Sequence, residues 1–186
     1  MTASSDDNWA HKVHEFWFKE CGPDDWFKKS DALDAEIRER FGSVHARLSQ
    51  WAPDDFLNTP EDAFAGIILF DQLSRNLFRG DPRSFASDPL ALRIARGMIA
   101  KGWDKDIAAD WRVFVYLPFE HSEAPADQDT CVEFVTALGD EEFIRYAKAH
   151  RDVIRRFGRF PHRNSILGRT STADEEAYLS QPGSGF

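Results

Sequence analysis

Five polar residues follow a strongly apolar stretch of the chain. Asp71, Arg75 and Arg79 are spaced four residues apart, so a helix places them on one face. Gln72 and Asn76 form a second polar row beside them. One interpretation is an intrahelical Asp–Arg pair near the C-terminal end of the helix, where the dipole favours arginine. The other interpretation is a polar wall that lines a cleft.

A histidine flanked by carboxylates follows Pro118, in the run Glu120, His121, Ser122 and Glu123. Such a histidine can act as a general base with an orienting acid, which makes His121 and Glu123 the candidate catalytic residues. Adjacent helical positions diverge by about 100° and cannot face one point, which excludes a serine triad built from this run alone. The alternative is a hydrogen-bonded polar cluster that satisfies the carbonyl freed by the proline.

The arginines are concentrated near the C-terminus. Between His150 and Arg169 the chain has six arginines and one acid, Asp152. This stretch therefore carries +5 and the rest of the chain −14, within a net charge of −9. The aromatic, glycine and proline residues of the stretch indicate a loop that presents its cations in fixed positions.

Four residues of this loop, Arg159, His162, Arg163 and Asn164, offer many hydrogen-bond donors and few acceptors. That balance suits a carboxylate or a phosphate. A helix start at Thr172 would add backbone N–H groups and the positive end of a dipole. The alternative is that the arginines form bidentate pairs with carboxylates of the acidic remainder.

We expect these segments to converge on a site for a small anionic molecule, either purely binding or catalytic through His121 and Glu123. The predicted ligand-binding residues are Asp71, Arg75, Arg79, Glu120, His150, Arg159, His162, Arg163 and Asn164. One alternative is a helical adaptor whose groove holds a protein partner. Another is a structural network with no ligand. The residue types assign neither a reaction nor an oligomeric state.

A metal site is disfavoured, although several potential ligands are present. None of them has the local spacing of a zinc or di-metal carboxylate site, and the neighbouring arginines would oppose a cation. The residues in question are Asp71, Glu120, His121, Glu123, His150 and His162. The nucleotide, metalloprotease, serine-hydrolase and calcium motifs are missing from the sequence. We therefore expect no metal and no cofactor.

Nucleic acid and membranes are disfavoured as partners. The arginine loop could stack RNA bases on Phe157 and Phe160, but the −14 remainder would repel the flanking phosphates. The longest apolar run, Ala63–Phe70, is far shorter than a membrane span. The first twelve residues lack the cations and apolar core of a signal peptide. Two isolated cysteines, Cys21 and Cys131, suit a reducing compartment, so we expect a cytoplasmic protein.

Helical periodicity runs through almost the whole chain. One stripe follows spacings of three and four residues from a capping Ser30, and comprises Leu33, Ile37, Phe41, Val44, Leu48 and Trp51. Further stripes are Trp9, Val13 and Phe16; Leu92, Ala95 and Ile99; and Phe143, Ala147, His150, Ile154 and Phe157. Start signals precede helices at Thr59-Pro60, Asp88-Pro89, Pro125, Asp140 and the capping box at Thr172. Gly80, Gly102, Gly139 and Gly158 mark helix ends.

The segment Trp111–Phe119 is rich in β-branched and aromatic residues and could form a buried strand. No second run of this kind exists to pair with it, so a buried helix kinked near Pro118 is expected. No linker or repeat divides the chain. We therefore expect one all-α domain over residues 1–186, an antiparallel array of seven or eight helices, with a helical core from about residue 8 to 180 after a short N-terminal tail.

These motifs, taken together, resemble the bacterial domain-of-unknown-function 924 family over essentially the whole chain. The matching segments are Phe16–Phe18, Trp26–Phe27, Phe70–Gly80, Phe85–Asp88, Tyr116–Glu123, His150–Asp152, Arg156–Asn164, Leu167–Thr172 and Glu175–Glu176. The resemblance implies an all-α fold of the tetratricopeptide-like superfamily, and it implies no activity or catalytic residue. Ser74 stands where the family usually has proline, which predicts a less interrupted helix at that point.

Overall fold

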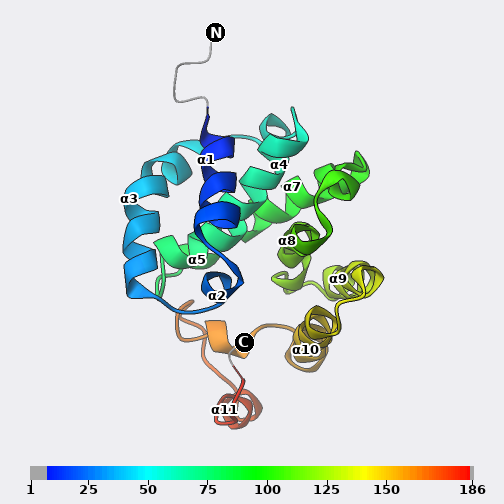
Figure 1. Ribbon diagram of the computed structural model, residues 1–186. Coiled ribbons are helices and arrows are strands. Elements are labelled where there is room, and N and C mark those ends of the chain that lie inside the picture. Colours follow the sequence, from blue (N-terminus) through cyan, green and yellow to red (C-terminus); the bar gives the residue numbers. More distant parts are fainter. Residues whose placement is uncertain (1–7, 185–186) are drawn as a thin grey trace. The chain divides into compact units, whose positions relative to one another are not determined.

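The computed structural model describes residues 8–184, and the regular elements in this range are all helical (Figure 1). The all-α expectation is therefore confirmed. Eight α-helices in this range have seven or more residues: α1 Trp9–Glu15, α3 Asp31–Leu48, α4 Pro60–Ile67, α7 Asp88–Ala100, α8 Ala109–Glu120, α9 Pro125–Leu138, α10 Glu141–Phe157 and α11 Ala173–Leu179. Shorter helices are α2 Pro23–Trp26, α5 Ser74–Leu77 and α6 Arg83–Ala86. The expected N-terminal tail lies outside the described residues.

The chain divides into two compact units. The first contains the residues up to Arg79 together with Arg83–Pro118, and the second contains Gly80–Pro82 and the residues from Phe119 onward. The α8 helix begins in the first unit, and its last two residues belong to the second. The expectation of a single domain over residues 1–186 stays a prediction.

The first unit is built around α4 and the segment that continues it. Thr59 caps α4 by accepting a hydrogen bond from the Asp62 N–H at 3.0 Å, and Pro60 occupies the first helical position, as the sequence predicts. The whole run Ala63–Phe70 is buried. Helices α1 and α7 both pack against α4 (Figure 1). An apolar segment without a polar face thus forms the centre of this unit.

The buried face of α3 differs from the predicted stripe. Ile37, Phe41 and Leu48 are buried as predicted, but Leu33 and Val44 are half-buried, and Trp51 lies beyond the helix end and is 37% exposed. Asp34 and His45 are buried in their place. Both polar side chains have partners inside the unit, which a stripe of apolar residues cannot reveal.

Two other predicted stripes are shifted in the same way. On α7 Leu92 and Ile99 are half-buried, and the buried face comprises Leu90, Ala91, Ile94, Ala95 and Met98. On α10 Phe143 and Phe157 are half-buried, and the buried face comprises Ile144, Ala147, His150, Val153 and Ile154. When a helix has a wide apolar face, the spacing of its residues is compatible with more than one buried row. The packing of the neighbouring helices determines which row faces inward.

A π-helical turn, Ile68–Leu73, separates α4 from α5. Helical backbone runs without a break through Ser74, from Pro60 to Leu77, and the comparison with a proline at this position stays a prediction. The Ser74 hydroxyl lies 2.8 Å from both His45 Nε2 and the Ser87 hydroxyl, and Ser87 donates to the Phe70 carbonyl at 2.8 Å. A widened turn frees backbone carbonyls, and the serines supply hydroxyls within reach of them.

Burial lowers the pKa of His45 to about 4, so its imidazole is neutral in the folded protein. The unfolded chain takes up this proton near an ordinary histidine pKa of about 6.5. His45 therefore makes its full contribution to the free energy of unfolding above that pH. Up to about 3 kcal/mol of this contribution is lost as the pH falls from about 6.5 to 4. We expect His45→Gln to flatten this part of the stability–pH curve, measured by chemical denaturation. An equal slope in His45→Gln and wild type would contradict the prediction, and the exposed His11→Gln is the control.

The segment Trp111–Phe119 is helical, with Pro118 inside α8, which confirms the helix over the strand. The amide of Gln128, on α9, donates to the Glu120 carbonyl at 2.6 Å and to the Ser122 carbonyl at 2.7 Å. A third carbonyl, that of Phe119, lies 3.4 Å away. One buried side chain from α9 thus satisfies the carbonyls at the end of α8.

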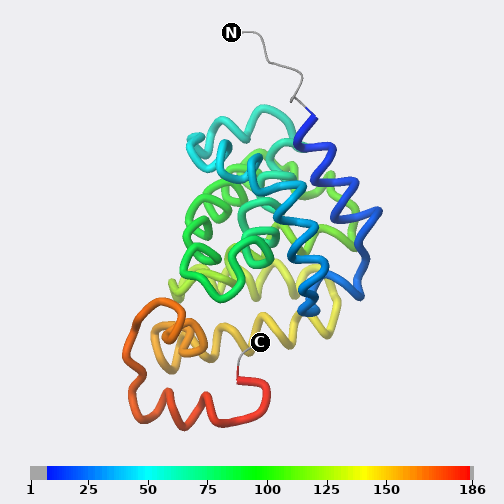
Figure 2. Tube along the Cα trace, turned by 90° about the vertical axis from the view of Figure 1, so that its left-hand side faces the viewer, coloured from blue at the N-terminus to red at the C-terminus, as the bar shows by residue number. Residues whose placement is uncertain are grey.

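In the second unit α9 and α10 lie side by side as an antiparallel pair (Figure 1). Gly139 and Gly158 end them at φ of 82° and 69°, a left-handed conformation that suits glycine. The chain then forms a loop, drawn in orange, and returns as α11 (Figure 2). The predicted capping box of α11 is present: Thr172 accepts from Glu175 N–H at 3.2 Å, and Glu175 accepts from Thr172 N–H at 2.7 Å.

Both cysteines are buried free thiols. Burial raises the pKa of Cys21 to about 11, which disfavours its reactive thiolate. Among the helices of residues 8–184, none combines the length and the hydropathy needed to cross a bilayer.

Candidate functional site

Arg159 is held by the start of α11. Its guanidinium forms a two-pronged pair with the buried carboxylate of Glu175, Nε to Oε1 at 2.6 Å and Nη2 to Oε2 at 2.8 Å. The same Nη2 donates to the Thr170 carbonyl at 2.9 Å. The hydrogen bonds from Arg159 outweigh burial and lower the pKa of Glu175 to about 2. Arg159 therefore fastens the loop to α11, and its predicted role in ligand binding stays a prediction.

Glu123 is the anchor for the other end of the loop. Arg169 places Nη1 at 2.9 Å from Oε2 and Nη2 at 3.0 Å from Oε1, and the Phe160 N–H donates to Oε1 at 2.8 Å. Burial tends to raise the pKa of Glu123, but these hydrogen bonds outweigh it and hold the pKa below its ordinary value. Glu123 thus accepts hydrogen bonds that hold the loop in place. Its catalytic role stays a prediction.

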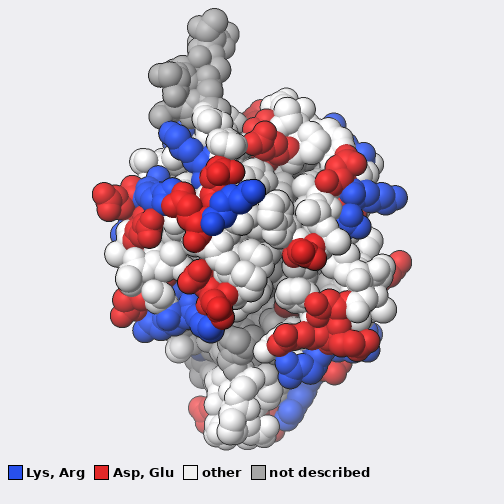
Figure 3. Space-filling view, in the orientation of Figure 1, with Lys and Arg blue, Asp and Glu red and all other residues white. Residues whose placement is uncertain are grey.

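The arginines of the loop and of α10 make several kinds of contact. Arg159 and Arg169 are held in two-pronged carboxylate pairs, the arrangement that the structural alternative predicts. On α10 the exposed Arg155 pairs with Asp129 at 2.7 Å, and Arg156 lies over the ring of Phe157 at 4.6 Å. Acidic and basic side chains lie next to one another over the face drawn in Figure 3. The contacts of Arg163 include the ring of Phe160 and a backbone carbonyl.

Phe160 is the centre of a cluster of basic side chains. The Arg163 guanidinium lies over its ring at 4.6 Å, and the rings of His150 and His162 lie 5.7 and 5.6 Å from it, centroid to centroid. His121 and His150 lie 6.5 Å apart, and Arg163 Nη2 donates to the His121 carbonyl at 3.0 Å. We call His121, His150, His162 and Arg163 the basic cluster. The sequence predicts the membership of all four in one site, and the structure places them together.

His150 is neutral within the basic cluster. Its Nδ1 lies 2.9 Å from the Tyr146 carbonyl, which can only accept, so Nδ1 carries the proton and Nε2 the lone pair. Burial, and to a smaller extent the positive charges of His121, His162 and Arg163, lower the pKa of His150 to about 3, although the hydrogen bond to the Tyr146 carbonyl acts in the opposite direction. The positive charges of His121, His162 and Arg163 therefore disfavour protonation of His150.

The buried Glu120 carboxylate lies at the edge of the basic cluster. Its Oε1 is 3.3 Å from His150 Nδ1, and the Cys131 thiol lies 3.8 Å from Oε2. Asn164, also buried, donates to the Ser171 hydroxyl at 3.1 Å and accepts from Arg169 Nε at 2.9 Å. Glu120 thus lies with the histidines, while Asn164 holds the loop.

The predicted polar row lies in the first unit and has partners that the spacing does not reveal. Arg75 pairs with Asp88 at 2.7 Å and donates to the Ser84 carbonyl, whereas its predicted partner Asp71 is 4.0 Å away. Arg79 donates to Asp34 at 2.8 Å. The intrahelical pair is thus secondary to pairs with other helices. Convergence of this row with the basic cluster stays a prediction.

Three residues that matter in this region were not among the predicted site residues. Gln128 caps α8, Glu175 holds Arg159, and Phe160 carries the basic cluster. The capping box gave a signal for Glu175, because its glutamate position is part of the motif. Phe160 was named only as a ring on which RNA bases could stack, and Gln128 gave no signal beyond its residue type.

The alternative sites receive no added support in residues 8–184. This range holds no group of three or more His, Cys, Asp or Glu side chains arranged to bind a metal. Its large apolar side chains with an exposed fraction above a third lie in four separate segments: Phe27, Trp51, Tyr146 and Leu167. They form no continuous strip along one element, and the adaptor interpretation stays a prediction.

Comparisons with known proteins agree with the fold and leave the chemistry open. A solved structure of a protein of unknown function, ATU0120 from Agrobacterium tumefaciens, is 40% identical and covers 92% of this chain and 96% of its own, with a TM-score of 0.87. A search of curated proteins gives no match. The family model described as bacterial protein of unknown function (DUF924) matches residues 13–183. The chain therefore belongs to the bacterial DUF924 family.

Proposed function

We propose that the protein binds a small anionic molecule at the basic cluster of the second unit. The observation that carries the proposal is the grouping of His150, His162 and Arg163 around Phe160, with His121 next to His150. Side chains that carry, or can take up, positive charge repel one another when they lie this close. A bound anion converts that repulsion into attraction, so the site gains most from a carboxylate, phosphate or sulfate group.

The surrounding contacts support a preformed site. Arg159 and Arg169 fix both ends of the loop that carries His162 and Arg163. The Arg163 guanidinium lies over the ring of Phe160, and Arg163 as a whole residue is only 6% exposed. Because these groups are positioned before the ligand arrives, binding requires little ordering of side chains. Of the nearby carboxylates, Glu123 and Glu175 are engaged by Arg169 and Arg159, and Glu120 lies beside His150.

A thermal-shift series with inorganic phosphate, sulfate and citrate tests the proposal. At about one hundred times Kd, a ligand that binds only the folded state stabilises it by roughly 2.7 kcal/mol. That corresponds to a rise in Tm of roughly 5–10 °C for a chain of this size. We expect this rise for wild type and a loss of most of it in His162→Gln and Arg163→Gln.

The matched control is Arg155→Gln, which removes an arginine of α10 that pairs with Asp129 on the surface. It should keep the full ligand-induced rise, because Arg155 does not belong to the basic cluster. Absence of any rise at millimolar anion in wild type would contradict the proposal. An equal rise in wild type and Arg163→Gln would contradict it as well, since general salt effects do not depend on this residue.

A further inference from the structure

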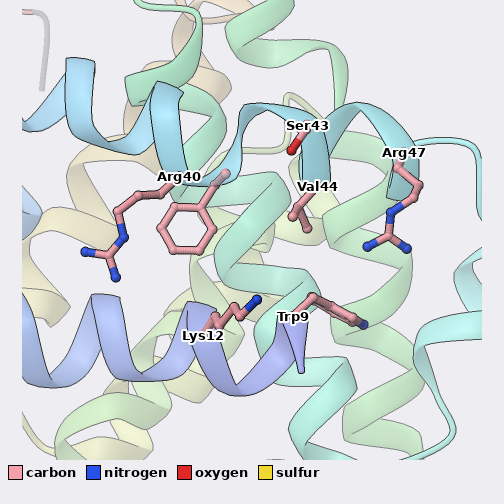
Figure 4. A pocket seen from close by; sticks show the side chains of 7 residues that line it. Trp9, Lys12, Arg40, Ser43, Val44 and Arg47 are labelled. Atoms are coloured by element: carbon pink, nitrogen blue, oxygen red, sulfur yellow. The ribbon is translucent and has the colours of Figure 1, made fainter. Parts of the chain in front are cut away.

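A pocket of about 310 Å³ opens between α1 and α3 in the first unit, and none of its lining residues belongs to the basic cluster. Its size is at the lower end of small-molecule sites, about 300–1,000 Å³. It is lined by Trp9, Lys12, Arg40, Phe41, Ser43, Val44 and Arg47. Figure 4 shows Lys12 extending from α1 toward α3 and Arg47 extending from α3 back toward α1. Two cations from different helices thus point into one space.

The positive charge of this pocket comes from Lys12 and Arg47. Arg40 lies at its other end and is neutralised, with Nη1 at 2.6 Å from Glu20 and 2.9 Å from Glu36. Within residues 8–184, the structure pairs no carboxylate with Lys12 or Arg47. An anion that enters between Lys12 and Arg47 would therefore meet two positive charges that no carboxylate of residues 8–184 neutralises.

The floor of the pocket is apolar. Trp9 and Phe41 are 7% and 3% exposed, and Val44 lies between the two cations in Figure 4. Ser43 adds a hydroxyl that can donate or accept. A ligand that fits this lining carries a compact dianionic group and a short apolar or aromatic part beside it.

We propose that this pocket is a second binding site, for a small aromatic phosphate monoester. The phosphate lies between Lys12 and Arg47, and the ring lies against Trp9 and Val44. Arginine and lysine both bind phosphate oxygens through charge-assisted hydrogen bonds, and arginine adds two-pronged geometry. The site is independent of the anion site proposed above, because it shares no residue with the basic cluster.

Titration calorimetry with phenyl phosphate tests the pocket, with inorganic phosphate and phenol as probes of the two halves. We expect phenyl phosphate to bind more tightly than either. Lys12→Gln and Arg47→Gln should each weaken it about tenfold or more, since a hydrogen bond to a charged group is worth at least about one decade in Kd. The indole N–H signal of Trp9 should shift in NMR spectra as the ligand is added.

The matched controls remove one cation of the same unit outside the pocket. Arg38→Gln on α3 and Lys19→Gln after α1 should bind phenyl phosphate as wild type does. Equal weakening in these controls, or no binding at millimolar ligand, would overturn the proposal. Loss of binding in Arg163→Gln with full binding in Lys12→Gln would also overturn it, and would assign the ligand to the basic cluster.

Discussion

Glu123→Ala is expected to lower the free energy of unfolding by about 2–4 kcal/mol. The substitution leaves the Arg169 guanidinium without its two-pronged partner and removes the acceptor of the Phe160 N–H. These groups are half-buried or buried, so water replaces the lost carboxylate poorly. A thermal melt should show a fall in Tm of roughly 5–15 °C, at about 2–4 °C per kcal/mol.

Glu142→Ala is the matched control, because this glutamate lies on the surface of α10 and pairs loosely with Arg145 at 3.6 Å. Exposed pairs contribute about 0–1 kcal/mol, so its Tm should change by a few degrees at most. Arg169→Lys keeps the charge and loses the two-pronged geometry, and should give an intermediate result. If Glu123→Ala melted within about one degree of wild type, Glu123 would not anchor the loop.

Phe160→Ala is expected to lower the free energy of unfolding by about 3–5 kcal/mol, the range for truncating a fully buried phenylalanine. Its side chain is 0% exposed and packs in one core with Val153 and Ile154. The ring also positions the Arg163 guanidinium and contacts two imidazoles. Chemical denaturation followed by circular dichroism measures the loss directly.

The half-buried Phe157, three residues earlier, provides the comparison. It packs against Tyr178 and lies under Arg156, so Phe157→Ala should cost clearly less than Phe160→Ala. Phe160→Leu retains most of the buried area but removes the flat ring. Relative to wild type, it should lose less of the free energy of unfolding than of the anion affinity. Equal losses for Phe157→Ala and Phe160→Ala would show that Phe160 has no central role in this core.

Helix positions were predictable because local signals determine them. Thr59-Pro60, Asp140 and the capping box at Thr172 each begin a helix where the sequence places it. The choice of buried row was less predictable: Asp34 and His45 face the core because partners on distant elements satisfy them. The π-helical turn before Ser74 was not predictable either, because the side chains that contact Ser74 are distant in sequence: His45 on α3 and Ser87 just before α7.

The candidate site was predictable in composition and only partly in pairing. The histidines and Arg163 were singled out by residue type, and the structure groups them around Phe160. Which arginines are engaged by carboxylates depends on contacts distant in sequence, such as Arg169 with Glu123. The charge count predicted an excess of positive charge in the C-terminal loop. It did not indicate which arginines pair with carboxylates and which could bind a ligand. The tetratricopeptide-like relation and the single domain stay predictions.

The most direct test of the proposed function is the dependence of sulfate affinity on pH. Sulfate remains a dianion across about pH 8 to 5.5, the range in which an ordinary imidazole titrates, so a change in Kd reports protonation of the protein. Because a bound anion favours protonated imidazoles, the account predicts that sulfate binds more tightly as the pH falls, and that His162→Gln reduces this dependence. A sulfate Kd that stays constant over this range, or no sulfate binding, would contradict the account.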